Sequence, residues 1–472
     1  MLFPTATFAL FFLVVLPLSW LTMHSPARWR LFIIAASYVF YSAWDWRFVF
    51  LLAGCTVWNQ VLAVRIWRTH DRRRRKALLV VALAGDLGVL GYFKYYGFFV
   101  DSAQGLLTRF GADATIDVRS VVLPVGISFF TFMAISYVVD AYRGDFQPTT
   151  FTKFAAFLSF FPHLVAGPIV RPSELVPQLD EPRDPRRVDT GRAFFLIASG
   201  LFLKVVIANT LASGIVDEVF GAPAQHSSLE VLVAVYAYSV QIFADFAGYT
   251  NIAIGVALLL GFTFPQNFNA PYSATSIQDF WRRWHMTLSR WLRDYLYIPL
   301  GGSRRGELLT YRNLMLTMLL GGLWHGAAWT FVVWGGIHGV ALCVSRWRRS
   351  RPGFATRRQT TWTTWRARIL TFNLVSVAWI FFRADSFGLA GEMLSGLFTR
   401  WGEPSPLVTL GVVAAIVVGL GSQLLPVRIP NLVMARFSRM PVLGQAAVLA
   451  LALMLTSALG PDGVAPFIYF QF

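Results

Sequence analysis

Long apolar stretches, each ended by charged residues, glycine or proline, recur along the whole chain. A helix that crosses the bilayer core needs about 20 mostly apolar residues. Several stretches are shorter than that or are broken by Gly and Pro, which is typical of re-entrant helices or of helices buried within protein. The pattern predicts an all-α polytopic membrane protein with apolar segments near residues 5–22, 31–43, 47–64, 77–93, 121–139, 154–170, 193–212, 229–262, 326–345, 369–382, 405–422 and 442–460.

Little in the sequence predicts a second domain. Residues 171–192 form a polar, proline-rich connector that is too short to fold alone, and there is no internal repeat or low-complexity tract. The first 20 residues lack the basic n-region and the small-residue cleavage site of a signal peptide, so we expect them to form the first span. We therefore predict a single integral membrane domain over residues 1–472.

Composition strengthens this interpretation. Hydrophobic residues make up 56% of the 472 residues and charged residues only 14%, against roughly 25% charged residues in an ordinary soluble domain. The composition excludes a disordered or fibrous protein, argues against a soluble enzyme and leaves room for about ten spans. Cys55 and Cys343 lie far apart in apolar runs and predict neither a disulfide framework nor a metal site.

The net charge of +17 is concentrated beside the apolar segments rather than spread evenly. Residues 65–76 hold seven Lys or Arg, and residues 346–368 hold eight Arg and no acidic residue. Basic clusters that flank spans follow the positive-inside rule, so we expect both loops in the cytoplasm and the N-terminus outside a multi-pass inner (plasma) membrane protein. We expect anionic lipid headgroups, and no nucleic acid, as partners of these arginines.

Residues 279–302 (DFWRRWHMTLSRWLRDYLYIPLGG) have the pattern of a strongly amphipathic interfacial helix. On a helical wheel Trp281 and Trp284 share an apolar side, and Arg282 and Arg283 lie opposite. His285 falls at the margin of the apolar side. An ionisable group is costly there and marks a candidate functional residue.

Residues 321–339 (GGLWHGAAWTFVVWGGIHG) supply a second histidine in apolar surroundings. His325 follows a Gly-Gly pair and opens an apolar run, and its ordinary pKa of about 6.5 suits proton transfer at neutral pH. His338 lies about 220° further round if the two histidines share one helix, so we interpret it as structural. The chain has neither HxxxH nor HExxH spacing, no GxSxG elbow and no Walker loop, so we predict no metal site and no nucleotide-driven hydrolase.

These motifs resemble those of the membrane-bound O-acyltransferase (MBOAT) family, in particular its bacterial branch similar to the alginate O-acetylation membrane protein. Most of them lie within residues 121–345. The resemblance rests on residues 91–99, 123–144, 160–174, 238–255, 261–302, 321–339, 378–386 and 466–472.

The resemblance implies a many-helix ring around a central tunnel, with re-entrant or interfacial helices. The histidine of the family's WHG motif falls on His325, which the resemblance makes the catalytic residue, and the second signature position falls on His285. The implied activity is O-acylation: an acyl group, acetyl in first place, moves from a cytoplasmic thioester to a hydroxyl. The acceptor is a cell-envelope polysaccharide or an extracytoplasmic partner protein that completes the transfer.

Acyl transfer requires a base for the hydroxyl proton and donors for the developing oxyanion. His325 suits the first task, and His285, a nearby indole N–H or the amide of Asn313 suits the second. No cofactor is expected to be bound, because acyl-CoA (acetyl-CoA) or an acyl-carrier thioester is the donor substrate. Basic residues near the motif, including Arg304 and Arg305, would attract its phosphates. Substrate-binding or tunnel residues are expected to include Trp281, Arg282, Arg283, Trp284, Asn313, Trp324, Gln241 and Asp245.

Two other functions remain open on sequence alone. The branch that transfers D-alanine to teichoic acid from a carrier protein shares the same signature positions. A membrane transporter or flippase would also be basic, polytopic and broken by glycine, although the two halves of this chain show no matching hydropathy.

Overall fold

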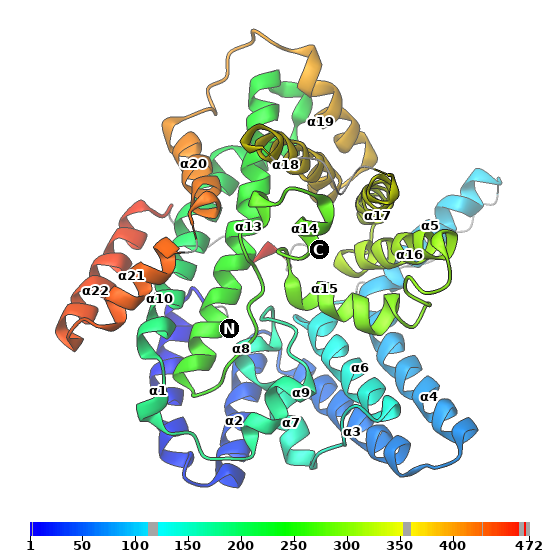
Figure 1. Cartoon of the computed structure of the whole chain (residues 1–472), viewed down its shortest axis with the longest axis vertical. Helices are drawn as coiled ribbons and strands as arrows, with labels where there is room; N and C mark the ends of the chain where they lie inside the picture. Colours follow the sequence, from blue (N-terminus) through cyan, green and yellow to red (C-terminus); the bar gives the residue numbers. More distant parts are fainter. Residues whose placement is uncertain (2, 112–120, 353–359, 427, 462–466, 469–472) are drawn as a thin grey trace. The chain divides into compact units, whose positions relative to one another are not determined.

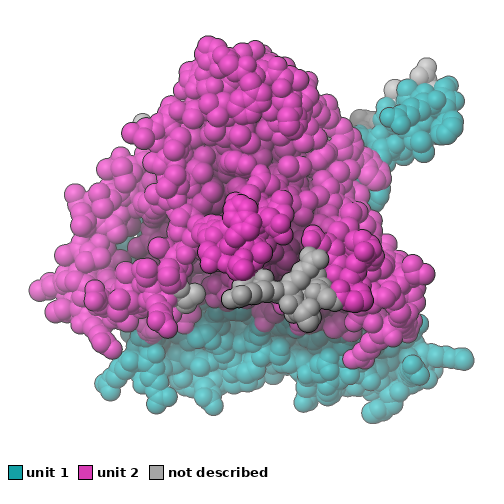
Figure 2. Space-filling view, turned by 45° about the horizontal axis from the view of Figure 1, so that its top comes forward, with its two compact units in different colours: residues 1–188, 256–265 teal, residues 189–255, 266–472 magenta. Residues whose placement is uncertain are grey.

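The computed structural model describes residues 1, 3–111, 121–352, 360–426, 428–461, 467 and 468, and these residues contain helices and turns but no strand (Figure 1). This confirms the predicted all-α class. Two compact units are present, Met1–Val188 with Val256–Pro265 and Asp189–Gly255 with Gln266–Phe472, coloured separately in Figure 2. The single membrane domain expected from the sequence stays a prediction.

Five helical stretches within the described residues are long and apolar enough to cross a bilayer: Arg47–Arg68, Arg72–Arg109, Thr190–Gly221, Ser228–Leu259 and Val442–Leu459. The helix Ala6–Thr22 is apolar but shorter. Two of the long stretches contain π-helical turns, at Gly91–Tyr95 in one and at Phe202–Ala208 and Ala212–Val216 in the other. The molecule is therefore a multi-pass membrane protein, whereas the expected total of about ten spans stays a prediction.

The first unit is built from α1 to α9, and polar side chains inside its apolar helices are paired across neighbours. Asn59 Nδ2 donates to Asp86 Oδ1 over 2.7 Å, and the Tyr137 hydroxyl donates to Gln60 over 2.8 Å. Such pairing is how polar groups persist between membrane helices. The helices are α1 Ala6–Thr22, α2 Pro26–Ser42, α3 Arg47–Arg68, α4 Arg72–Leu90, α5 Tyr96–Arg109, α6 Ile127–Arg143, α7 Phe151–Ser159, α8 Phe161–Leu164 and α9 Pro172–Leu175.

The second unit contains the candidate functional residues. Its helices are α10 Thr190–Leu201, α11 Asn209–Leu211, α12 Asp217–Gly221, α13 Ser228–Leu259 (whose last four residues belong to the first unit), α14 Ile277–Trp281, α15 Met286–Leu292, α16 Glu307–His325, α17 Trp329–Ser350, α18 Thr361–Arg383, α19 Phe387–Thr399, α20 Leu410–Leu424, α21 Arg428–Ser438 and α22 Val442–Leu459.

Helices α16 and α17 form a hairpin whose two backbones touch (Figure 1). A Cβ atom on Gly335 would overlap the carbonyl oxygen of Met318, and one on Gly322 would overlap the carbonyl oxygen of Phe331. Glycine at these positions therefore allows a closer approach than any other residue would, as at many helix contacts in membranes. We call this contact the glycine seam.

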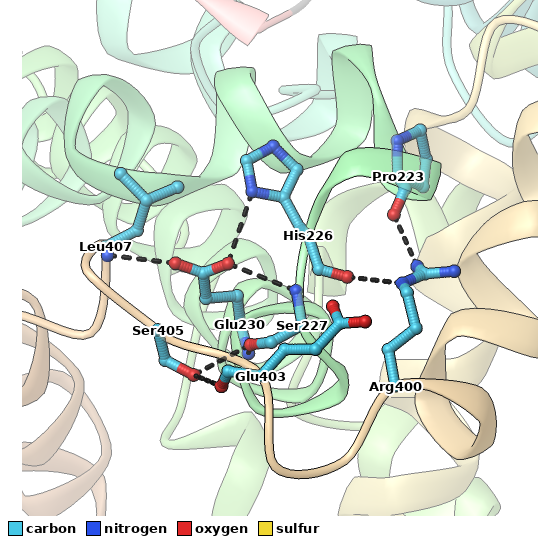
Figure 3. Close-up of polar contacts among 8 residues, drawn as sticks. All are labelled: Pro223, His226, Ser227, Glu230, Arg400, Glu403, Ser405 and Leu407. Carbon is cyan, nitrogen blue, oxygen red and sulfur yellow. Dashed lines mark hydrogen bonds and ion pairs between the residues drawn. The ribbon is translucent and has the colours of Figure 1, made fainter.

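A buried polar network joins the start of α13 to the segment after α19 (Figure 3). The Glu230 carboxylate accepts hydrogen bonds from the backbone N–H groups of Ser227 and Leu407, and it lies 3.3 Å from His226 Nδ1. The Arg400 guanidinium donates to the carbonyl oxygens of His226 and Pro223, each over 2.6 Å. The network fixes the connection from α19 to α20 against the first turn of α13.

Candidate active site

The segment 279–302 is not one continuous helix, so that part of the sequence prediction is wrong. Helix α14 ends at Trp281, residues 282–285 form a turn, and α15 begins at Met286. His285 sits in the break with φ 40° and ψ 55°, a left-handed conformation that is strained for a non-glycine residue. The two sides of the segment nevertheless differ as predicted, because Trp281 and Trp284 are buried and Arg282 is exposed.

The break exists because a residue outside the segment competes for its hydrogen bonds. The backbone N–H of Met286 donates to the carbonyl oxygen of Asn267 over 2.9 Å. The side-chain Oδ1 of Asn267 accepts from the Thr287 backbone N–H over 3.3 Å and from the Thr287 hydroxyl over 2.9 Å. A pattern read along one helix contains no signal for such a remote acceptor.

The same Asn267 oxygen sets the tautomer of His285. His285 Nδ1 lies 3.1 Å from Asn267 Oδ1, and the Thr287 backbone N–H, which can only donate, identifies that Asn267 atom as the acceptor. Nδ1 must therefore carry the proton, and the lone pair of the neutral ring belongs to Nε2. His285 is fully buried, and the edge of Phe246 from α13 packs against it at 4.7 Å between ring centroids.

His325 is the last residue of α16 and is 3% exposed. Trp324 contacts both candidate histidines, with ring centroids 4.9 Å from His325 and 6.2 Å from His285. The ring centroid of Trp334 lies 5.0 Å from that of His325. The structure thus brings together the two histidines that the sequence singled out, although 40 positions separate them in the chain.

His338 also belongs to this row, contrary to the sequence interpretation. That interpretation placed His325 and His338 on one helix, whereas α16 ends at His325 and α17 returns alongside it from Trp329. His338 consequently contacts the same Trp334 ring as His325 does, at 4.8 Å. Imidazole and indole rings alternate in the order His285, Trp324, His325, Trp334, His338.

The expected substrate-binding residues differ in their surroundings. Arg282, Arg304 and Arg305 are exposed, whereas Arg283 is paired with Asp279 at 2.8 Å. The fully buried amide of Asn313 donates to the Gly302 carbonyl and accepts from Arg312. Asn313 precedes His325 by 12 residues on α16, or about 18 Å along the helix, and its role as an oxyanion donor stays a prediction.

Of the two residues expected on α13, Asp245 is buried and Gln241 is half-buried. Asp245 forms an ion pair with Lys204, and its second oxygen accepts from the Ile468 backbone N–H over 2.8 Å. Each of these interactions favours the charged carboxylate, as buried charges require. Asp245 therefore has partners within the bundle, and a role in a tunnel stays a prediction for both residues.

Comparison with known proteins identifies the family. Residues 90–390 match the model of the membrane-bound O-acyltransferase family. The chain belongs to the MBOAT family. The match confirms the family expected from the sequence and its membrane-bound O-acyltransferase activity, and the matched range contains the region 121–345, in which most of the motifs lie.

Relatives of this MBOAT chain carry the name of the same reaction class. The "probable alginate O-acetylase AlgI" of Azotobacter vinelandii is 44% identical, over 79% of this chain and 74% of that protein. A peptidoglycan O-acetyltransferase of Helicobacter pylori is 38% identical, over 84% of this chain and 80% of that protein. A teichoic acid D-alanyltransferase of Streptococcus thermophilus is 28% identical, over 55% of this chain and 68% of that protein.

Sequence reasoning on this MBOAT chain missed two residues of the site and the helix that carries its central histidine. Asn267 lies in a non-helical stretch of the motif-bearing segment 261–302, and neither Asn267 nor Trp334 was singled out as a site residue. The helix α16 was absent from the predicted apolar segments because Arg312, Asn313 and Glu307 interrupt its hydropathy. Among the described residues, no group of three His, Cys, Asp or Glu side chains is placed to hold a metal ion.

Proposed function

We propose that this chain moves an acetyl group from a cytoplasmic thioester, either a coenzyme A ester or a phosphopantetheine carrier, to a hydroxyl on the other side of the inner membrane. The acceptor is a cell-envelope polysaccharide or a partner protein that completes the transfer to one. Acetyl is preferred to D-alanyl because the relatives named for acetyl transfer are 38% and 44% identical over most of the chain, against 28% for the D-alanyltransferase.

One observation carries the proposal: His325 and His285 contact the same indole, that of Trp324, in a buried aromatic core. Proton transfer in such a core does not compete with water, and an N–H donor is worth more there than in solvent. Trp324 supplies a donor-only indole N–H between two imidazoles. A transporter would not require this combination of base, donor and second imidazole.

The proposed chemistry gives one task each to His325, Trp324 and His285. His325 takes the proton of the acceptor hydroxyl as its oxygen attacks the thioester carbonyl carbon. The indole N–H of Trp324 stabilises the tetrahedral oxyanion. The C–S bond then breaks, and the leaving thiolate recovers the proton from the His325 imidazolium. A positioned base is typically worth 10²–10⁴-fold in rate.

His285 is proposed as the supporting residue that holds a substrate by accepting a hydrogen bond from a hydroxyl or N–H group other than the hydroxyl that His325 deprotonates. With its proton fixed on Nδ1 by Asn267, the neutral ring offers an acceptor at Nε2 rather than a donor. This orientation favours a hydrogen bond from a hydroxyl and disfavours the oxyanion role that the sequence left open for His285.

The donor is proposed to approach along the exposed arginines Arg282, Arg304 and Arg305, which the positive-inside rule assigns to the cytoplasmic side. Their positive charge raises the local concentration of a phosphate-bearing donor, and this effect falls with salt. Arg283 is left out of this group because Asp279 neutralises it.

The test supplies purified chain, in lipid nanodiscs, with isotope-labelled acetyl-CoA or an acetylated carrier protein. Candidate acceptors are an envelope polysaccharide and extracytoplasmic proteins, and mass spectrometry locates the label. Label on a hydroxyl that requires His325 is the expected result. Transfer of labelled D-alanine instead of acetyl would establish the second candidate function. Passage of an unmodified solute with no acyl transfer would refute the proposal.

A further inference from the structure

His338 is a buried titratable residue that the proposed chemistry does not use. Its side chain is 1% exposed, and neither ring nitrogen has a hydrogen-bond partner among the described residues. The ring stacks on Phe280, with centroids 6.1 Å apart, and meets Trp281 and Trp334 edge-on at 5.2 and 4.8 Å. Buried polar groups are paired in the great majority of cases, so a histidine lacking both partners requires an explanation.

The two tryptophans that touch His338 share this property. Within the described part of the chain, the indole N–H groups of Trp281 and Trp334 find no acceptor, and the side chains are 9% and 1% exposed. Their ring centroids lie 5.8 Å apart. The adjacent Trp379, in contrast, donates its N–H to the Tyr272 hydroxyl over 3.2 Å. Among the described residues, these three rings in mutual contact thus bring together four nitrogens that lack a hydrogen-bond partner.

These three rings define the chemistry of a ligand group. Two indoles supply two donors, and a neutral imidazole supplies one donor and one acceptor. An uncharged group with a carbonyl oxygen and an N–H complements this set, because the oxygen accepts more than one hydrogen bond and the N–H supplies the single donor that the imidazole requires. A secondary amide has this composition. A charged group does not suit the set, because the aromatic surroundings contain no counter-charge.

The position of the rings connects this chemistry with the active site. His338 and His325 both contact the Trp334 ring. Trp281, the most exposed of the three rings, is followed directly by the exposed Arg282. On α17, the exposed Arg349 follows His338 by about 16 Å of helix rise. The three rings therefore lie between the histidine site and a basic surface.

We propose that His338, with the indole N–H groups of Trp281 and Trp334, binds an amide in the arm of the thioester donor. The inference rests on the proposed function, in which the donor is a coenzyme A or phosphopantetheine thioester. The arm of such a donor carries two secondary amides between its thioester and its phosphate. His338 is accordingly a specificity-determining residue that recognises the donor at a distance from the reacting carbon.

The test compares two acetyl donors that differ in the arm alone. Acetyl-pantetheine carries both amides, and the acetyl thioester of a simple alkyl thiol carries none. The readout is the ratio of kcat/KM for the two donors in the wild type and in His338→Leu, Trp281→Phe and His338→Gln. Trp281→Phe keeps a ring and removes the N–H, whereas His338→Gln keeps one donor and one acceptor. His163→Leu is the control, since His163 is also fully buried but belongs to the first unit.

We expect His338→Leu to lower this ratio about tenfold, because a buried hydrogen bond contributes roughly that factor. Trp281→Phe should lower it several-fold, His338→Gln should restore most of it, and the control should leave it unchanged. If His338→Leu lowers kcat/KM equally for both donors, His338 is a packing residue and the amide site is refuted. The proposed class of donor is not affected by that result. A wild type that uses neither thioester would refute the proposed donor, and the amide site with it.

Discussion

Asn267 is predicted to act on catalysis entirely through His285, and the Asn267→Ala variant tests this. Removing Oδ1 leaves three buried donors without their acceptor: His285 Nδ1–H, the Thr287 backbone N–H and the Thr287 hydroxyl. Each such group costs about 1–3 kcal/mol when unsatisfied, and the hydroxyl can rotate to another acceptor. We therefore expect a loss of about 2–5 kcal/mol in the free energy of unfolding.

Because Asn267 acts through His285, its removal should not lower kcat by more than the removal of His285 does. Without Asn267 the imidazole loses its fixed tautomer and its orientation, so kcat should fall about 10–100-fold, part of what a positioned group contributes. The double variant Asn267→Ala/His285→Ala should be no slower than His285→Ala alone, because a residue that acts through another adds nothing once the other is gone.

The assay measures acetyl transfer per folded molecule at saturating donor, together with the thermal unfolding midpoint. Asn269→Ala serves as the matched control, since Asn269 lies two residues further on and is exposed. Two results would refute the reasoning: an Asn267→Ala enzyme with normal kcat, or a double variant in which the two losses multiply.

Four further predictions follow from the site and the helices that carry it. His325→Ala should lower kcat about 10²-fold or more at unchanged donor binding, and combination with His285→Ala should be less than additive; retention of a tenth of normal activity by His325→Ala would exclude it as the base. Reversing Arg282, Arg304 and Arg305 to Glu should raise the donor KM and weaken its salt dependence. Reversing the exposed Arg72, Arg73 and Arg74 should leave the donor KM unchanged. Equal effects of the two triple variants would mean that the donor KM depends on the overall charge of the protein and not on the position of these arginines. Gly335→Ala should destabilise the fold by about 1–3 kcal/mol through overlap in the glycine seam, while the adjacent Gly336→Ala, whose Cβ would sit 3.6 Å from Leu319, should be tolerated. Hydrogen bonds from Arg346 lower the pKa of Glu307, so the pair should contribute a small stability above the ordinary glutamate pKa of about 4.3 that disappears as pH falls through the lowered pKa; Glu307→Gln should remove this acid dependence of the unfolding midpoint.

The fold class and both signature histidines could be predicted because they depend on local properties of the sequence. Apolar length identifies membrane helices wherever they occur, and a histidine in apolar surroundings is conspicuous against a low charge content. The two sides of segment 279–302 were also predictable, since alternation of Trp and Arg survives a break in the helix. None of these inferences requires knowledge of which residues meet across the fold.

The parts that could not be predicted depend on remote contacts. The break at His285 is made by Asn267, 18 positions earlier, and helical periodicity carries no information about such an acceptor. His338 was assigned to the wrong face because the turn between α16 and α17 separates it from His325, and a wheel drawn through that turn is meaningless. The hydrogen bond from the Asn313 amide to the Gly302 carbonyl is likewise a contact that a pattern along one helix does not show.

The glycine seam also fixes the register of the hairpin. The distance between α16 and α17 is set by direct contact between their backbones. Sliding one helix past the other would therefore bring a bulky residue such as Phe331 into a gap that admits only glycine. One inserted residue turns every later side chain on its helix by about 100°, which would carry Trp334 and His338 away from His325. Insertions and deletions within the helical residues between Gly322 and His338 should therefore disrupt the row of rings, so changes in chain length that alter the substrate range are expected elsewhere in the chain, whereas substitutions can act within it.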